Sequence, residues 1–281
     1  MDFSEVIILL GAGFAAVMFF IRWYHFTLGG IQIKEGAFVR TAFCLMPLLS
    51  FTIILYTLIS LASFDVVDSG FWIFFYLLIG FAWLYGGLFL MFIFFDLSWV
   101  DDALNMNNPA AALAVTGGAL GLTLIYAGAN IGDGPGWWCV FLAGGLGVIS
   151  WVILGVLINA VTDIFRRITV GRDIFCGVRA GAYFLASGII FGRACAGDWT
   201  SFSQTAVEFG DGWPVLLLTA VFILTELLFA ATDKQGSQSN KAVKGFISVM
   251  LGAAYISAAV FAVKMLPPLP VNPIYQTTPM D

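Results

Sequence analysis

The chain has 281 residues, of which 60% are hydrophobic and only 10% are charged. A soluble domain usually carries about 25% charged residues, so this chain cannot cover a water-exposed surface with polar groups. That composition excludes a soluble globular enzyme, a nucleic-acid-binding protein and a disordered protein. The mean hydropathy of +0.97 instead indicates a membrane protein with several spans, and the net charge of -5 does not say on which side of a bilayer the charge lies.

Eight long apolar segments follow one another along the chain. A helix needs about 20 mostly apolar residues to cross the hydrocarbon core, because lipid offers no partner for an unpaired backbone group. Such segments occupy residues 5–26, 37–63, 70–95, 109–131, 136–162, 174–197, 213–232 and 243–266. Polar or glycine-rich stretches separate them. We therefore predict an all-α fold, a polytopic transmembrane bundle of about eight spans.

Two of the helix pairs in this series resemble each other. Gly117 and Gly128 match Gly181 and Gly192, and a Gly-Asp sequence follows each helix at 132–133 and 197–198. The returning helices also align, and each ends in Thr-Asp at 162–163 and 232–233. Both copies start on the same side, so we predict a tandem parallel repeat, unlike the inverted repeats of many transporters.

The repeat divides the chain into five regions. We predict an aromatic-rich three-helix region at 1–100, two paired-helix repeats at 101–170 and 171–234, a final span at 235–266 and a proline-rich tail at 267–281. Because proline favours extended backbone, we expect the tail to be a solvated segment outside the membrane that can lie on a partner protein.

The repeat region resembles a known family. The motif Asn-Pro-Ala-Ala-Ala-Leu at 108–113 is followed by Gly117 and Gly118, and Arg172 and Asp173 open the second unit. Together they resemble the YjfL-type family of bacterial inner-membrane proteins, which are built from paired-helix domains of unknown function. The resemblance covers about residues 101–233 and implies an all-helical fold in a bacterial inner membrane. It implies no catalytic residue.

Basic residues predict the orientation. With the N-terminus outside, nine basic residues face the cytoplasm and only Arg193 and Lys264 lie near the outer surface, as the positive-inside rule requires. An even number of spans returns the C-terminus to the outside. The nine cytoplasmic residues are Arg22, Lys34, Arg40, Arg166, Arg167, Arg172, Lys234, Lys241 and Lys244.

Arg179 and Glu226 are charged residues inside predicted spans, and each lies about 10 Å from the cytoplasmic end at ~1.5 Å per residue. A charge at such a place costs about 2.5 to 3.5 kcal/mol even on a lenient insertion scale. The aligned positions of the first repeat are Val115 and Val156, so the two charges occur together in the second unit. We predict a structural ion pair, with a proton or ion site as the alternative.

Small and amide side chains in the spans favour helix packing. Gly117, Gly121, Gly188 and Gly192 predict close helix contact, because small residues let backbones approach. The same is expected of residues 11–16, Gly-Ala-Gly-Phe-Ala-Ala, in the first span. Asn159 and Asn130 are predicted to join neighbouring helices by hydrogen bonds, with pore lining as the second interpretation. Asp163 and Asp233 are expected to pair with a nearby cation such as Arg166, Arg172 or Lys234.

The outer turns carry the carboxylates Asp133, Asp198, Glu208 and Asp211 beside glycine, proline and tryptophan. Helix capping and an interfacial aromatic belt explain most of this chemistry. Weak attraction of cations is the alternative, although no spacing matches a calcium loop. Four buried, inert thiols are the expectation for the cysteines, and a disulfide between Cys139 and Cys195 is chemically allowed at the outer face.

The sequence contains few residues of the types that enzymes use for catalysis. His25 is the only histidine, which disfavours a zinc site or a Ser-His pair, and we expect no catalytic residue, cofactor or metal. Two functions remain. The first is a non-catalytic assembly, scaffold or accessory subunit that binds other membrane proteins or itself. The second is a small-ion channel or transporter that uses Arg179 and Glu226. The scarcity of intramembrane polar residues favours the first.

Overall fold

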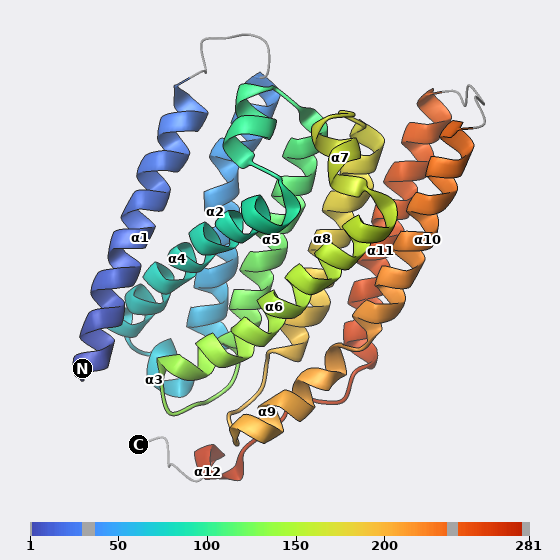
Figure 1. The fold of residues 1–281 in the computed structure, drawn as a ribbon. Coiled ribbons are helices and arrows are strands. Elements are labelled where there is room, and N and C mark those ends of the chain that lie inside the picture. The colour runs from blue at the N-terminus through green and yellow to red at the C-terminus, as the bar shows by residue number, and fades with distance from the viewer. Residues whose placement is uncertain (1, 30–36, 235–240, 277–281) are drawn as a thin grey trace.

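The computed structural model describes residues 2–29, 37–234 and 241–276, and within them the chain forms helices and no strand. Eight helices are long and apolar enough to cross a membrane, which confirms the predicted all-α transmembrane bundle (Figure 1). They are α1 (Phe3–Leu28), α2 (Ala37–Ser60), α4 (Gly70–Phe95), α5 (Pro109–Ala129), α6 (Trp137–Thr162), α8 (Ile174–Ala194), α10 (Pro214–Lys234) and α11 (Lys241–Met265). The chain is therefore a multi-pass membrane protein.

Local side chains decide where the central helices start and stop. The side chain of Asn108 accepts hydrogen bonds from the first turn of α5, and Asp173 does the same for α8, as N-cap residues do. Helices α4 and α6 end at Asp96 and Asp163, whose φ angles of 48° and 52° lie in the left-handed region. This conformation stops a helix because it turns the backbone away from the helical path.

Short helices occupy the two ends of the bundle, where the sequence pattern did not predict them. They are α3 (Phe64–Val67), the π-helical turn η1 (Trp99–Asn105), α7 (Ile164–Thr169), α9 (Phe202–Glu208), the 3-10 turn η2 (Phe209–Gly212) and α12 (Pro273–Gln276). The start of α1 lies with α3, α9 and α12 at the bottom of Figure 1, and η1 and α7 lie at the top. We call these the acidic end, which carries Glu5, Asp65, Asp133, Asp198 and Glu208, and the basic end, which carries Arg40, Arg166, Arg167 and Arg172.

The eight long helices form two layers of opposite direction. Helices α2, α5, α8 and α11 pack side by side in that order, and each runs from the basic end to the acidic end. Helices α1, α4, α6 and α10 run the other way and also follow one another by contact. In the most apolar stretch of each helix, 78% of the residues of α5 and 67% of those of α8 are buried. The corresponding shares are 11% for α1 and 22% for α11. The first and last helices are therefore the edges of the array.

Helices α5 and α8 pack backbone against backbone. A Cβ atom added to Gly117 would lie 2.0 Å from the Gly181 carbonyl oxygen, and one added to Gly128 would lie 1.9 Å from that of Gly192. All four glycines predicted for helix packing lie in this contact, because Gly121 and Gly188 also approach each other directly. Glycine is required here, since any side chain would displace the partner backbone.

Within residues 11–16 the same expectation is met by Ala12 and Ala16, which are buried, and fails at Gly11. A Cβ atom added there would meet no atom within 4 Å, so this glycine faces open space between α1 and its neighbours instead of packing closely. Sequence alone cannot tell which glycine of an apolar helix faces a neighbour, because the spacing pattern is uniform around such a helix.

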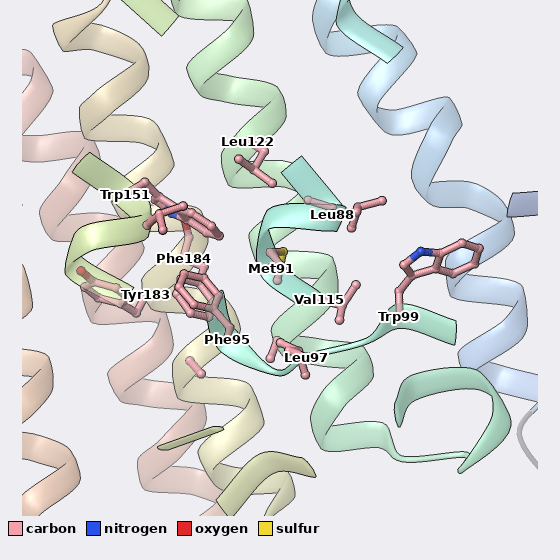
Figure 2. Packing of buried hydrophobic residues seen from close by; sticks show 14 of the residues in the cluster. Leu88, Met91, Phe95, Leu97, Trp99, Val115, Leu122, Trp151, Tyr183 and Phe184 are labelled. Atoms are coloured by element: carbon pink, nitrogen blue, oxygen red, sulfur yellow. The ribbon is translucent and has the colours of Figure 1, made fainter. Parts of the chain in front are cut away.

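Aromatic rings fill the space between the two layers (Figure 2). Phe95, at the end of α4, stacks on Phe165 of α7 with 4.6 Å between ring centroids and on Phe184 of α8 at 5.5 Å. Trp151 of α6 closes the cluster at 4.9 Å from the Phe184 ring. This cluster fixes α7 against α8, which positions the charged residues described next.

Candidate functional site

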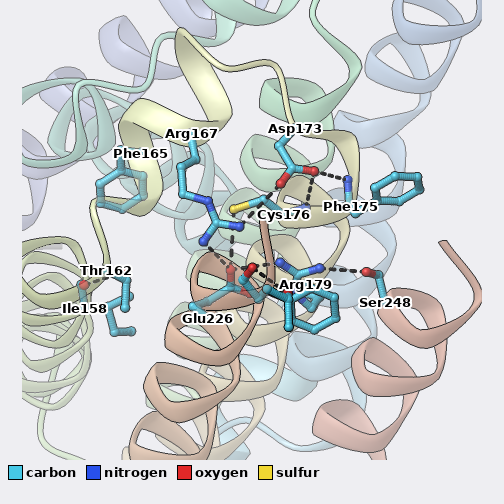
Figure 3. A network of polar contacts seen from close by, with 12 residues as sticks. Ile158, Thr162, Phe165, Arg167, Asp173, Phe175, Cys176, Arg179, Glu226 and Ser248 are labelled. Carbon is cyan, nitrogen blue, oxygen red and sulfur yellow. Dashed lines mark hydrogen bonds and ion pairs between the residues drawn. The ribbon is translucent and has the colours of Figure 1, made fainter. Parts of the chain in front are cut away.

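Arg179 of α8 and Glu226 of α10 meet in the interior (Figure 3). The Nε of Arg179 donates to Oε1 of Glu226 at 2.5 Å, and its Nη2 donates to Oε2 at 2.8 Å. Both side chains are 0% exposed. A bidentate pair of this kind is the strongest geometry that a guanidinium and a carboxylate can adopt.

A second arginine and a second carboxylate extend the pair toward the basic end. Arg167 of α7 donates from Nη1 to Oε2 of Glu226 at 2.8 Å and from Nη2 to Oδ2 of Asp173 at 3.3 Å. Lys244 of α11 lies 3.8 Å from the same Asp173 oxygen. We call these five residues, Arg167, Asp173, Arg179, Glu226 and Lys244, the charge network. It joins four helices, α7, α8, α10 and α11.

Neutral groups complete the surroundings of Arg179. Its Nη1 donates to the Ser248 hydroxyl of α11 at 2.6 Å, and its guanidinium carbon lies 3.9 Å from the centre of the Phe229 ring. The thiol of Cys176 points at Oε2 of Glu226 from 3.8 Å. Arg179 thus has a partner on each of its three guanidinium nitrogens, and Glu226 has one on each oxygen, which is the condition under which buried charges are tolerated.

The positions of Arg167 and Asp173 follow from helix ends. The left-handed residue Asp163 ends α6, and α7 starts at once; the Asn159 side-chain oxygen accepts a hydrogen bond from the Phe165 amide at 3.1 Å. This short helix directs Arg167 inward. Asp173 uses Oδ1 to cap α8 and Oδ2 to bind Arg167, so one carboxylate serves the helix start and the charge network.

Exposure falls along the charge network toward the interior. The side chains of Arg167 and Asp173 are each 19% exposed and that of Lys244 is 17% exposed, whereas Glu226 is fully buried. Burial lowers the pKa of Arg167, but the opposing influence of Cys176, Glu226 and Asp173 prevails and the pKa is raised above its ordinary value. This guanidinium therefore stays charged, and the charge network has three cations for two carboxylates.

The positions that the sequence aligns with Arg179 and Glu226 differ in burial. Val115 of α5 is 1% exposed, whereas Val156 of α6 is 41% exposed. Gly155, beside Val156, is buried. Neither aligned position carries a charge.

The predicted ion pair lies among partners that sequence reasoning missed. Arg167, Asp173, Lys244 and Ser248 were not expected near Arg179. One signal was available, because Arg167 and Asp173 flank the predicted start of the second unit, close in sequence to the buried charge. Lys244 and Ser248 carried no such signal, since they come from the last span and reach Arg179 only through the packing of α11 on α8.

Other polar predictions have mixed outcomes. Asp163 pairs with Arg166 at 2.6 Å, and both side chains are mostly exposed. The expected pairing of Asp233, and any role of Lys234, lies outside the described side chains. Asn159 and Asn130 do not join neighbouring transmembrane helices, which corrects that expectation: Asn159 binds the following α7, and Asn130 donates to Tyr126 in its own helix at 2.8 Å.

The acidic end brings three of the four predicted carboxylates together. Asp133, Asp198 and Glu208 line one cavity of about 300 Å³, and Asp211 does not. Cys139 and Cys195 line the same cavity, and both are free thiols. Within the described ranges, no group of three or more His, Cys, Asp or Glu side chains has the arrangement to hold a metal ion.

The proline-rich tail differs from its prediction. Residues 267–275 lie on the protein's own acidic end, where the Asp198 amide donates to the Pro270 carbonyl at 3.0 Å. Asn272 donates to Asp198 and Trp199 at 2.9 and 2.7 Å and is only 9% exposed. The tail is therefore bound to this chain at Pro270 and Asn272, while Val271 and Ile274 are 56% and 73% exposed. Residues 277–281 are outside the described residues.

Comparison with protein-family models, with curated proteins and with solved structures finds no match for this chain. The charge network, the helix packing and the cavity are the features of the chain that bear on its function.

Proposed function

We propose that the chain is a non-catalytic assembly or accessory subunit of a membrane complex, set in a bacterial inner membrane with the acidic end and both termini outside. The charge network carries this proposal. Its buried carboxylate and guanidinium satisfy each other, and a partner on every nitrogen and oxygen leaves them no vacancy for a transported ion. A transport site instead needs ion binding weak enough for release.

The packing of α5 on α8 supports the same conclusion. These are the two central helices, and their glycine backbones touch along most of their length, at Gly117, Gly121 and Gly128. A path between them would require the backbones to separate. A centre closed by backbone contact favours a subunit that holds other proteins in place. The excess of basic residues on one side supports the proposed orientation.

An apolar groove on the side of the bundle supplies a contact surface for a partner. It has a volume of about 630 Å³ and lies between α1, α4 and α6. Three glycines in its lining, Gly11, Gly86 and Gly145, have no atom within 4 Å of an added Cβ. Open glycines permit the close approach of another helix, so the proposed occupant is a transmembrane helix of a partner subunit.

A flux assay tests the proposal against the alternative of a small-ion channel or transporter. Wild-type protein and Glu226→Gln are reconstituted in liposomes, and proton and monovalent-cation flux are measured with empty liposomes and a known ionophore as controls. We expect both proteins to match empty liposomes. Flux in the wild type that disappears in Glu226→Gln would overturn the assembly role.

A second experiment tests the groove. A photo-crosslinking amino acid replaces Phe89 in the groove, and the matched control replaces Leu224 on α10; the two side chains are 61% and 62% exposed. In native membranes, we expect Phe89 to yield one defined protein adduct and Leu224 to yield lipid adducts. Lipid adducts at both positions would contradict the proposed contact.

A further inference from the structure

The cavity at the acidic end has a lining that the assembly role does not explain. It is closed by the segments that follow α2, α5 and α8, together with the start of α1 and part of α9. Among the described residues, its lining contains five carboxylates and no lysine, arginine or histidine. Those carboxylates are Glu5, Asp65, Asp133, Asp198 and Glu208. Such a lining creates a strongly negative potential in a confined space.

Two polar side chains that are more than nine-tenths buried face this cavity without a full set of partners. Tyr76 is 8% exposed, and its hydroxyl makes no hydrogen bond with the described part of the chain. Asn130 is 6% exposed; its nitrogen donates to the Tyr126 carbonyl, but its side-chain oxygen accepts no hydrogen bond from a described residue. The Tyr76 hydroxyl and the Asn130 oxygen are open to the cavity, so a ligand in the cavity can bind both.

The carboxylates divide into structural and free groups. Asp198 is structural, because its two oxygens accept hydrogen bonds from the amides of Asp133 and Asn272 at 2.8 and 2.9 Å. Asp133 uses only Oδ1, which accepts from the Phe64 amide at 3.1 Å, and its second oxygen is free to bind a ligand. Asp65 makes no hydrogen bond or ion pair with the described residues. The free acceptors in the lining thus include Asp65, one oxygen each of Asp133 and Glu208, and the oxygen of Asn130.

Aromatic rings complete the lining. Trp72, Trp137 and Trp199 line the cavity together with Tyr76. Indole and phenol faces attract cations, and the attraction is stronger when the cation is removed from water. A volume of about 300 Å³ lies at the small end of the range for small-molecule sites. Aromatic walls, free oxygen acceptors and no basic side chain favour an organic cation.

We propose that this cavity binds a small organic cation that carries a primary ammonium group. An ammonium group has three N–H donors and no acceptor, which matches the free oxygens of Tyr76, Asn130 and Asp133. The Asp65 carboxylate adds a second negative charge to the same lining. The hydrophobic part of the ligand packs on the tryptophan rings. A bare metal ion fits less well, because the described residues offer no metal-holding group of three ligands. This binding does not depend on the assembly role.

Isothermal titration of the full chain in detergent micelles tests the site, with putrescine as the probe. We expect saturable binding to the wild type. Tyr76→Phe and Asp133→Asn each remove one ligand contact, and the new amide oxygen in Asp133→Asn still accepts from the Phe64 backbone. We expect each to weaken binding, Asp133→Asn by about tenfold or more because its contact is charge-assisted. The matched control is Asp68→Asn, which removes a carboxylate outside the cavity lining and should leave affinity within about twofold.

Binding of different cations distinguishes a specific ammonium site from non-specific electrostatic attraction. Tetramethylammonium has no N–H group, so we expect it to bind at least about tenfold more weakly than putrescine. Magnesium chloride at equal ionic strength should not saturate. Equal binding of all three cations, equal loss in Asp68→Asn and Asp133→Asn, or no binding of putrescine would overturn the proposal. Size-exclusion profiles identical to that of the wild type establish that each variant is folded.

Discussion

The helix pairs α5–α6 and α8–α10 have different interiors. In the first pair, Val115 is buried, and the ring of Phe95 occupies the space beside the buried Gly155, where an added Cβ would lie 2.2 Å from it. In the second pair, the buried residues include Arg179 and Glu226. One interior is thus closed by an aromatic ring and the other by an ion pair.

The difference shows what a buried charge requires from the rest of the fold. The neutral pair needs only the Phe95 ring of α4 to fill its interior, because apolar contact has no preferred direction. The charged pair needs donors and acceptors at defined places, and two other segments supply them: Arg167 from α7 and Ser248 from α11. The Phe229 ring of α10 itself lies over the Arg179 guanidinium. The charge network therefore fixes the mutual positions of α8, α10 and α11 more specifically than apolar packing does.

Removal of the central carboxylate is expected to have the largest effect. Glu226→Leu leaves Arg179 buried without its partner and also deprives Arg167 of a contact. We expect a loss of about 3 to 5 kcal/mol in the free energy of unfolding, measured by denaturation in mixed detergent micelles. The control Asp211→Asn removes a carboxylate outside the interior and should change stability by less than about 0.5 kcal/mol. Equal effects of the two variants would contradict the role of pairing.

Conversion of the second pair to a neutral interior is the next largest expected effect. The double variant Arg179→Met and Glu226→Leu removes both buried charges, so we expect it to recover about 2 to 4 kcal/mol of the loss caused by Glu226→Leu alone, because apolar replacement of a buried ion pair is often neutral or stabilising. A double-mutant cycle in the same assay measures the coupling. A double variant no more stable than Glu226→Leu would show that the charges do not act as a pair.

The shared contact of the two pairs should tolerate even a methyl group poorly. Gly128→Ala forces α5 and α8 apart, because the new Cβ would overlap the Gly192 carbonyl, and we expect a loss of about 1 to 3 kcal/mol. Gly145→Ala on α6 is the matched control, since nothing lies within 4 Å of its added Cβ. Thermal unfolding in detergent compares the two. Similar midpoints for both variants would contradict the close backbone contact.

Exchange of the cap of α8 for that of α5 should have a smaller effect. Asp173→Asn converts the cap of the second pair into the residue type that caps the first, Asn108. The amide oxygen still accepts from the first turn, but the ion pairs with Arg167 and Lys244 are lost. Because these groups are partly exposed, we expect about 0.5 to 1 kcal/mol, read from unfolding curves at low salt. An unfolding curve identical to that of the wild type would show that the ion pairs of Asp173 do not stabilise the fold.

The exposed ion pair at the end of α6 should contribute least. Arg166→Gln breaks the contact with Asp163, and the two side chains are 75% and 58% exposed. Solvent screens such a pair, so we expect less than about 0.5 kcal/mol. Unfolding at low and high salt checks this. A loss above about 1 kcal/mol in the free energy of unfolding would show that the pair stabilises the protein more than a solvent-screened pair can.

Particular residues show how far sequence reasoning reached into the candidate site. The pairing of Arg179 with Glu226 was predicted because the two opposite charges lie at equal depth in neighbouring spans, where few other charged partners exist. Arg167 was missed because the turn that directs it inward, α7, is six residues long and has no periodic pattern of its own. Ser248 was missed because a serine in an apolar helix is common and its neighbour depends on packing.

The eight spans were determined by the sequence alone, because a bilayer imposes the same length and hydropathy on each helix independently of its neighbours. Helix ends at Asn108, Asp163 and Asp173 also follow from local chemistry. Tertiary structure decided the rest: which glycines touch, that the tail binds Asp198, and that the acidic turns enclose a cavity. These depend on contacts between residues far apart in the chain, and an apolar helix looks much the same from every side until its neighbours are in place.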